Sequence, residues 1–410
     1  MEFLTGVFLF YSFIAMYFSF LFFLIYFKNR KKLFYYPPVT KKYEVSFVVP
    51  CYNEEKSIGQ TIENIMNIGY SNLKKIIVVD DCSKDSSFKI MKEYEKKYPE
   101  LVLAVQTPKN TGNAAGAKNY GSKFAKTELI CFTDADSFPE KGALDKMVGF
   151  FDDKEVGAVT SSVCAYNQNT FLERVQAIEY TLVKFTRKLL EFIDSIYVTP
   201  GPLALYRRNY FEEIGKFDES NLTEDIEIAW RFLSKGYKVK MSLPATVYSI
   251  VPNNLKTWKN QRLRWNFGGV QTILKYKKKI FNGTMLGNFV VPFFILSWFL
   301  GLSGLGFLAY KGIKSLALRY FIIKDTLQAE IALIRLNDFS FVPSIIFFFS
   351  IFLIFIGISY SIISISHVPG KGFKKSKIFS FLAYELFYML ASPIILVISV
   401  LRLIRGKKKW

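Results

Sequence analysis

Two aspartates separated by one residue, Asp134 and Asp136, form the pattern that most directly suggests chemistry. They follow the apolar run 129–133, which we expect to be a buried strand. Two carboxylates at a strand end can hold one hard divalent cation and leave room for phosphate oxygens. The alternative is a turn stabilised by the aspartate side chains. The neighbouring motifs favour the cation site.

A second group of polar residues follows two other apolar runs. Tyr52 and Glu54 come after the run 45–50, and Asp81 comes after the run 75–80. A carboxylate there can accept a hydrogen bond from a nucleotide base, and a tyrosine ring can pack on a base or ribose. No G-x-G-x-x-G follows the first run, and the sequence has no G-x-x-x-x-G-K-[ST]. The pattern therefore favours a nucleoside diphosphate held through a metal over a dinucleotide or a P-loop nucleotide.

An alternation of strands and helices has to position these residues. We predict strands at 45–50, 75–80, 101–107 and 128–133, and helices at 56–68, 84–97 and 113–124. Such alternation specifies an α/β domain with a parallel sheet covered by helices, and ligands bind such sheets at the carboxyl ends of the strands. The polar residues described above all lie at those ends.

Five motifs occur in an order that is typical of one enzyme family: Val48–Glu55, Val78–Ser83, Asp134–Asp136, Leu222–Asp225 and Gln261–Trp265. They cover roughly residues 44–270 and resemble the family 2 glycosyltransferases, which have a GT-A fold with a mixed, mainly parallel sheet. The T-E-D and Q-x-x-R-W motifs are similar to those of membrane synthases of poly-N-acetylglucosamine, chitin oligosaccharides, hyaluronan and cellulose. The Gly268-Gly269 pair that follows is most similar to the first two of these types.

The resemblance implies a donor site at five of the matching positions. Asp81 would contact the nucleotide base, and Tyr52 and Glu54 would line the same pocket. Asp134 and Asp136 would lie at the donor diphosphate and bind its Mg2+ or Mn2+.

The resemblance also implies that Asp225 is the general base that takes the proton from the acceptor hydroxyl. Inverting transfer needs one carboxylate opposite the leaving diphosphate, and a metal ion stabilises the leaving group. The alternative is a carboxylate that only begins the predicted helix 225–235, where the helix dipole favours it.

The Q-x-x-R-W motif would place Gln261, Arg264 and Trp265 over the donor site. An indole ring can stack on a sugar, and Gln261 or Arg264 can reach phosphate oxygens. The alternative is an interfacial helix, because Trp and Arg both favour the headgroup region, and both interpretations can hold together.

Two segments match the family pattern less closely. The loop 110–119 is one residue longer than the common form, and its Lys118 is a candidate for the donor phosphates. The segment 200–203 resembles the acceptor side of the site, where Gly201 permits a close backbone approach; a simple turn is the alternative. The acceptor is expected to meet Gly201, Glu224 and Trp265.

The net charge of +20 does not indicate a nucleic-acid partner. Residues 44–250 carry 26 Lys and Arg against 29 Asp and Glu, so the basic excess lies in the flanking segments. Basic charge beside apolar runs is typical of juxtamembrane segments that face anionic headgroups. Four dispersed cysteines and one histidine make a Cys/His zinc site implausible.

Four long apolar runs occur at 3–27, 286–310, 341–366 and 379–404, and a bilayer span needs about 20 such residues. We expect the first to be a membrane helix and not a cleaved signal peptide, because of its acidic Glu2 and its length. The basic residues from Lys28 to Lys42 then place the N-terminus outside and the catalytic domain in the cytoplasm.

The orientation of the C-terminal region is less consistent. Three C-terminal spans place 367–378 inside, which agrees with the basic residues Lys371, Lys374, Lys375 and Lys377. They place the C-terminal tail outside, which disagrees with its basic residues Arg402, Arg405 and Lys407–Lys409. A re-entrant 286–310 would reverse both assignments. Residues 315–336 have helical apolar spacing but carry five charges, so we predict an interfacial helix there that does not span the membrane.

These observations predict four segments: a membrane helix with a basic linker (1–43), a GT-A domain (44–250), the Q-x-x-R-W segment with an interfacial helix (251–285) and a membrane region (286–410). The leading hypothesis is a multi-pass cell-membrane enzyme that transfers a sugar from a UDP-sugar, with UDP-N-acetylglucosamine as the expected donor, to a growing polysaccharide. The alternative is a single addition to a membrane lipid, as in ceramide glucosyltransferases; a non-catalytic scaffold is a remote third. Accessory subunits or a homo-oligomer could supply more helices.

Overall fold

The predicted strands form the centre of a larger sheet than the sequence indicates. The computed structural model describes residues 2–328, 345–367 and 377–405. Its strands are β1 (Val45–Cys51), β2 (Leu73–Asp80), β3 (Val102–Gln106), β4 (Leu129–Phe132), β5 (Ser137–Pro139), β6 (Val156–Ala165), β7 (Ala204–Arg207) and β8 (Lys238–Ser249). Their order in the sheet is β3-β2-β1-β4-β7-β6-β8-β5.

The pairing of the strands explains why the polar residues meet. β1 pairs in parallel with β2 and β4, and Cys51 lies opposite Asp80, so the two following loops leave the same edge. β7 runs antiparallel to β4, with Ala204 opposite Phe132. The segment before β7 therefore reaches the same edge as the segment after β4. The sheet is mixed, as expected.

The helices fall into two groups. Those of the α/β domain are α2 (Ile58–Met66), α3 (Ser87–Lys97), α4 (Ala114–Ser122), α5 (Asp145–Val148), α6 (Phe171–Glu191), α7 (Arg208–Glu213), α8 (Glu224–Ser234) and α9 (Leu255–Tyr276). The others are α1 (Glu2–Asn29), α10 (Val291–Gln328), α11 (Ile345–His367) and α12 (Lys377–Ile404). A π-helical turn, Leu286–Val290, leads into α10.

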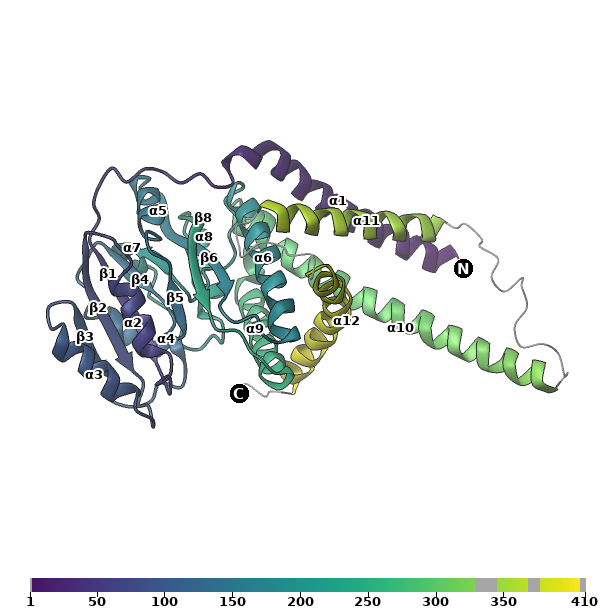
Figure 1. Cartoon of the computed structure of the whole chain (residues 1–410). Coiled ribbons are helices and arrows are strands. Elements are labelled where there is room, and N and C mark those ends of the chain that lie inside the picture. Colours follow the sequence, from purple (N-terminus) through teal and green to yellow (C-terminus); the bar gives the residue numbers. More distant parts are fainter. Residues whose placement is uncertain (1, 329–344, 368–376, 406–410) are drawn as a thin grey trace.

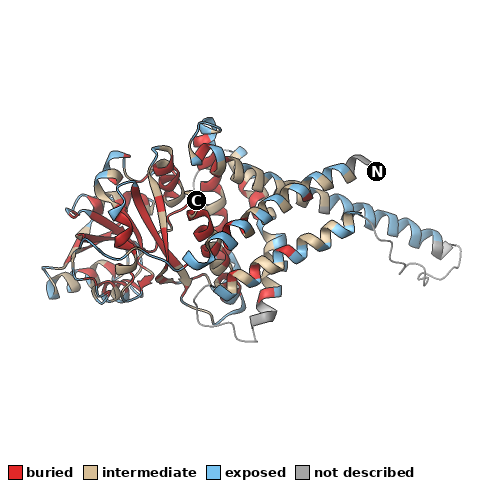
Figure 2. Cartoon of the chain, turned by 90° about the horizontal axis from the view of Figure 1, so that it is seen from above, coloured by how far each residue is buried: buried red, intermediate tan, exposed pale blue. Residues whose placement is uncertain are grey.

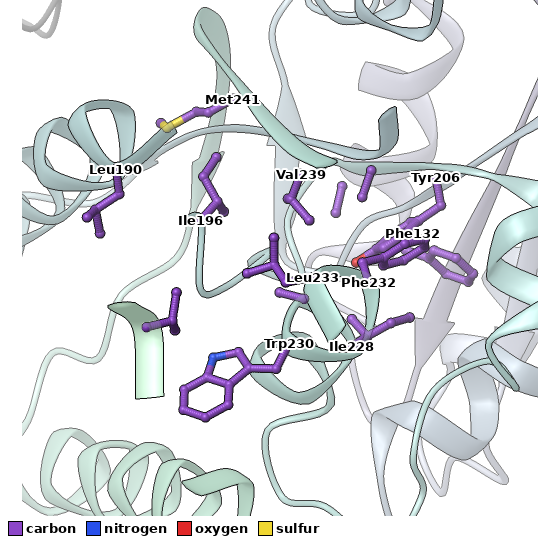
Figure 3. Packing of buried hydrophobic residues seen from close by; sticks show 14 of the residues in the cluster. Phe132, Leu190, Ile196, Tyr206, Ile228, Trp230, Phe232, Leu233, Val239 and Met241 are labelled. Carbon is purple, nitrogen blue, oxygen red and sulfur yellow. The ribbon is translucent and has the colours of Figure 1, made fainter. Parts of the chain in front are cut away.

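The core fixes α8 against the sheet. Figure 3 shows Ile228, Phe232 and Leu233 of α8 in one buried cluster with Phe132 of β4 and Tyr206 of β7. The exposed fractions of these five side chains do not exceed 5%. Burial of large apolar side chains of this kind stabilises a fold by about 1.5–3 kcal/mol each. The start of α8 is therefore held rigidly relative to the end of β4.

Helices α6 and α9 lie between the sheet and the apolar helices (Figure 1). A capping box begins α6: Thr170 accepts a hydrogen bond from the Glu173 N–H, and Glu173 accepts one from the Thr170 N–H. α9 begins at Asn254, whose side chain accepts a hydrogen bond from the Thr257 N–H. The two helices carry many of the residues that line the candidate site.

The four predicted apolar runs all form helices in the described residues. Helices over Thr5–Lys32, Leu286–Asp325, Ile345–His367 and Phe381–Ile404 are long and apolar enough to cross a membrane. Their surfaces are mostly exposed or half-buried, whereas the α/β domain has a buried interior (Figure 2). α1 packs beside α11, and the Tyr26 hydroxyl hydrogen-bonds to His367 at 3.0 Å. Exposed apolar helices of this kind indicate association with a membrane.

The described part of the predicted interfacial helix 315–336 belongs to a longer helix, and its location at a membrane surface stays a prediction. α10 continues without a break from Val291 to Gln328. The sequence after Gly312 contains no glycine or proline up to Gln328, so nothing in it ends the helix. Residues 329–344, with the predicted charges Glu330 and Arg335, lie outside the described residues, as do Lys371, Lys374, Lys375 and Lys407–Lys409.

α12 packs along α6 and α9. Phe381 belongs to a cluster with Ile178 and Leu182, whereas Ile395 belongs to a cluster with Leu172. α12 therefore runs antiparallel to α6 over most of its length. This contact ties α12 to the α/β domain.

Candidate active site

The loop after β1 presents Tyr52 and Glu54 at the edge of the sheet. Asn53 adopts a left-handed backbone conformation with φ 55, which asparagine tolerates better than most residues. Its side-chain oxygen accepts a hydrogen bond from the Lys84 N–H at 2.8 Å, so the loop is tied to the one after β2. Tyr52 remains 45% exposed, which leaves its ring free to contact a ligand.

Asp81 is buried and organises the next loop. Its carboxylate accepts hydrogen bonds from the Thr107 hydroxyl at 2.8 Å, the Thr111 hydroxyl at 2.8 Å and the Thr111 N–H at 2.9 Å. Asn110 also donates to the Asp81 carbonyl at 2.8 Å. Asp81 lines the cavity and holds residues 107–111 in place, while its predicted contact with a nucleotide base stays a prediction.

Asp134 and Asp136 follow β4 in a turn that other segments fix. The Thr61 hydroxyl donates to the Ala135 carbonyl at 2.7 Å. Gly201 packs against Asp134 so closely that a Cβ atom would lie 2.5 Å from its carboxylate oxygen. The predicted close approach at Gly201 is therefore present, and its partner is the Asp134 carboxylate. Any side chain at position 201 would displace that carboxylate.

Asp136 lies among negatively charged side chains, an arrangement that a bound divalent cation would neutralise. Burial, together with the negative charges of Asp134 and Glu54, raises the pKa of Asp136 to about 7. The described residues contain no cluster of three or more His, Cys, Asp or Glu side chains with metal-site geometry. Two carboxylates completed by substrate phosphates are the usual way in which proteins bind Mg2+. The donor set thus fits a cation shared with a diphosphate, and it does not fit an all-protein cage.

Lys118 on α4 joins the two acidic motifs. Its ammonium lies 2.9 Å from a Glu224 oxygen and 3.4 Å from an Asp134 oxygen, and its side chain is 2% exposed. Burial alone would lower the pKa of Lys118, but the charges of Glu224 and Asp134 outweigh this effect and raise it. Lys118 is therefore a permanent cation at the centre of the site.

Asp225 lies in the first turn of α8, and its carboxylate accepts a hydrogen bond from the Ile226 N–H at 2.9 Å. Burial and the charge of Glu224 raise the pKa of Asp225, the charges of Lys118 and Arg264 oppose them, and the net result is a pKa of about 7. A carboxyl with a pKa near neutrality can take a proton from a hydroxyl and release it again at ordinary pH.

The Q-x-x-R-W motif occupies one turn of α9. Arg262 forms an ion pair with Glu179 of α6 at 2.5 Å and lies 4.1 Å from the centre of the Trp265 ring. Arg264 is exposed to the cavity and forms no ion pair with any described residue. The buried side-chain oxygen of Gln261 has no hydrogen-bond partner in the described chain. Arg262 thus fixes the helix, while Gln261 and Arg264 have free polar atoms for a ligand.

Gly268 lets α9 approach the start of α8. A Cβ atom at this position would lie 2.2 Å from the Thr223 hydroxyl, immediately before Glu224 and Asp225.

We expect Gly268→Ala to fold but to lose about 100-fold in turnover, because displacement of a catalytic group by about 1 Å has that cost. Kinetics of the purified variant test this, with Gly306→Ala as the control, since open space surrounds Gly306. Unchanged turnover in Gly268→Ala would contradict the tight packing.

Every predicted site residue lines a single cavity of about 740 Å³. The sequence reasoning missed a second set of lining residues on α6 and α10: Tyr180, Val183, Lys184, Arg187, Phe294 and Trp298. Their signal in the sequence is weak. Tyr180, Val183, Lys184 and Arg187 recur at helical spacing in an amphipathic segment, which is also the pattern of an ordinary buried helix face.

Comparison with known proteins identifies one domain of the chain. Residues 46–215 match the model of Glycosyl transferase family 2. The chain contains a family 2 glycosyltransferase domain. The predicted family and the GT-A-type fold are therefore confirmed.

Relatives of the family 2 domain include the poly-beta-1,6-N-acetyl-D-glucosamine synthase of Staphylococcus aureus (strain COL), which is 29% identical over 233 residues. That match covers 56% of this chain and 56% of the relative. The probable glycosyltransferase YdaM of Bacillus subtilis (strain 168) is 31% identical over 243 residues, with 58% of each chain covered. The chain thus spans little more than half the length of the curated relatives it matches.

The fold is shared beyond the family 2 domain. A mannosyltransferase from Pyrobaculum calidifontis, solved in complex with GDP-Man and Mn2+, superposes with a TM-score of 0.60. The superposition covers 96% of this chain and 97% of the other, at 18% sequence identity. The arrangement of apolar helices around the domain therefore belongs to the common fold.

Proposed function

We propose that this protein is an inverting, metal-dependent membrane glycosyltransferase that transfers a sugar from a UDP-sugar to a growing polysaccharide. One observation carries the proposal. The residues expected to bind the nucleotide, the metal and the acceptor hydroxyl line one cavity, although they come from five separate motifs. The family 2 domain supports the reaction class.

The donor would occupy the end of the cavity at β1 and β2. Tyr52 offers a ring for the base or ribose, while Asp81 keeps the neighbouring loop in position. Asp134 and Asp136 would hold Mg2+ or Mn2+, and a bound divalent cation neutralises the charge that develops on the leaving diphosphate. The Mn2+ in the mannosyltransferase of similar fold supports a divalent cation as the cofactor.

The acceptor would lie between Asp225 and the donor sugar. Asp225 takes the hydroxyl proton, and the charges of Lys118 and Arg264 favour its ionised form. Gln261, Arg264 and Trp265 cover the donor from α9. On the acceptor side of the cavity, Gly201 packs against Asp134, and Glu224 pairs with Lys118.

The identity of the sugar and of the product rests on the relatives. The poly-beta-1,6-N-acetyl-D-glucosamine synthase favours UDP-N-acetylglucosamine as donor and a polysaccharide as product. Four apolar helices favour a multi-pass protein in the cell membrane, with the basic residues after α1 holding the catalytic domain on the cytoplasmic side.

A specific observation favours the second candidate, a single addition to a membrane lipid. The cavity continues from Asp225 to Phe294 and Trp298 of α10, one of the helices long enough to cross a membrane. An apolar acceptor could reach the site along this wall.

Product size tests the proposal. The purified full-length protein is incubated with Mn2+, a panel of radiolabelled UDP- and GDP-sugars and membrane lipids, and the labelled product is sized. A long polymer that resists lipase establishes a polysaccharide synthase and identifies its donor. One sugar on an organic-extractable lipid establishes the second candidate, and the absence of transfer from every donor would reject both.

A further inference from the structure

Arg187 is a buried cation without a partner. It lies on α6, its side chain lines the cavity, and only 5% of the residue is exposed. Its Nε and Nη1 atoms are buried and have no hydrogen-bond partner in the described chain. Burial lowers the pKa of Arg187, and the neighbouring Tyr197 and Asp225 only partly offset this effect. Such an arrangement opposes folding, because a buried guanidinium ordinarily needs several acceptors.

A second buried cation lies one turn earlier on the same face of α6. Lys184 is 3% exposed and donates to the Cys164 sulfur at 3.0 Å, and it forms no ion pair with a described carboxylate. The acidic residue of α6 that lines the cavity, Glu179, is already paired with Arg262. The α6 wall of the cavity therefore carries two cations that form no ion pair with a described carboxylate, although the charge of Asp225 acts on Arg187.

Apolar side chains of a membrane-type helix lie next to these cations. The Tyr197 and Phe294 rings are 4.7 Å apart, and the Trp230 and Phe294 rings are 5.8 Å apart. The Trp230 indole nitrogen is also buried without a partner, and it lines the same cavity. This end of the site thus combines unpaired donors with an apolar wall that leads to α10.

We propose that this end of the cavity binds a lipid whose head group carries a phosphate, with Arg187 and Lys184 holding the phosphate and the α10 side chains contacting the apolar chain. A guanidinium matches a phosphate by paired hydrogen bonds, and burial strengthens the contact. The inference rests on the proposed function and names the chemistry of its acceptor or primer. The phosphate of the donor is held elsewhere, at Asp134 and Asp136.

Titration with a soluble probe tests the site. The full-length chain in phosphatidylcholine nanodiscs is titrated with hexyl phosphate, hexanol or inorganic phosphate, using calorimetry. We expect hexyl phosphate to bind best, and Arg187→Gln to raise its Kd about 10- to 100-fold, the effect of losing a charged hydrogen bond. Arg187→Lys should retain part of the affinity. Arg174→Gln, an exposed arginine on the same helix, is the matched control and should bind like the wild type.

Three results would overturn the inference. They are equal binding of hexyl phosphate to wild type and Arg187→Gln, equal binding of inorganic and hexyl phosphate, and displacement of hexyl phosphate by UDP with Mn2+. The melting temperature of Arg187→Gln distinguishes a ligand-binding arginine from a structural one. Removal of an unpaired buried charge should leave the Tm unchanged or raise it, and a lower Tm would mark a structural role.

The proposed function is tested separately in the same experiment. UDP with Mn2+ should bind the wild type, Arg187→Gln and Arg174→Gln with equal Kd. If UDP with Mn2+ fails to bind the wild type, the proposed function is wrong, and the hexyl phosphate titration still decides whether the lipid phosphate site exists.

Discussion

Asp225→Asn lowers the turnover number by about 10²–10⁴-fold while the affinity for UDP with Mn2+ stays the same. The range is that of a lost general base. Asparagine has nearly the same shape, and its oxygen can still accept the hydrogen bond from the Ile226 N–H that Asp225 accepts at 2.9 Å. The fold around α8 should therefore survive. Steady-state transfer kinetics, combined with calorimetric UDP titration, measure both effects.

The pH dependence separates a base from a merely structural carboxylate. Burial and the Glu224 charge raise the pKa of Asp225 to about 7, so the group is protonated, and inactive as a base, below that pH. At saturating Mn2+ the wild-type rate should fall about tenfold for each pH unit below 7 and level off above it. The residual rate of Asp225→Asn should lack this dependence. Asp153→Asn, an exposed aspartate outside the cavity, is the control, and full turnover in Asp225→Asn would remove Asp225 as the base.

Asp136→Asn lowers transfer by about 10²–10³-fold and abolishes the Mn2+ dependence of UDP binding. The reason is that this carboxylate is one of two that would hold the cation at the leaving diphosphate. Asp134→Asn should act in the same way and in addition weaken the contact with Lys118, which lies 3.4 Å from Asp134. UDP titrations with Mn2+ and with EDTA give the affinities.

Stability gives an independent check on the same carboxylate. Burial and the charges of Asp134 and Glu54 raise the pKa of Asp136 from 3.8 to about 7. At pH 8 without metal its ionised form therefore opposes folding, and Asp136→Asn should unfold at a higher temperature than the wild type. The difference should shrink as the pH falls from 7 to 4. Mn2+ should raise the Tm of the wild type but not that of the variant. A Tm rise with Mn2+ in both proteins would place the cation elsewhere.

The positions of the Q-x-x-R-W residues show where motif reasoning reaches its limit. The motif identified Gln261, Arg264 and Trp265, and all three line the cavity. It did not indicate that Arg262 pairs with Glu179 of α6, or that Glu179 also accepts a hydrogen bond from Tyr388 of α12 at 2.6 Å. Glu179 is 83 residues from Arg262 and 209 residues from Tyr388 in the sequence. Contacts over such separations depend on packing and have no local sequence signal.

Local sequence determined much of the α/β domain. Strand-length apolar runs and helical spacing gave β1 to β4 with α2 to α4, because side-chain periodicity is set by local backbone geometry. The carboxyl-end rule then gathered Tyr52, Asp81 and Asp134 at one edge, since parallel strands end on the same side. The short antiparallel strands β5 and β7 carried no comparable pattern. The four apolar runs were equally clear, because a bilayer span needs a long uninterrupted apolar segment.

Only the tertiary structure decided which groups are left without partners. Gly201 and Gly268 are ordinary glycines in the sequence, and their importance comes from Asp134 and Thr223 packed against them. Arg187 is one charged residue among many until the fold buries it, with Nε and Nη1 lacking a hydrogen-bond partner among the described residues. Burial and pairing are properties of the whole packed chain, because the cost of a buried charge depends on every group around it. The sequence thus indicated the reaction class, and the tertiary structure showed which buried groups remain for the second ligand site that we propose.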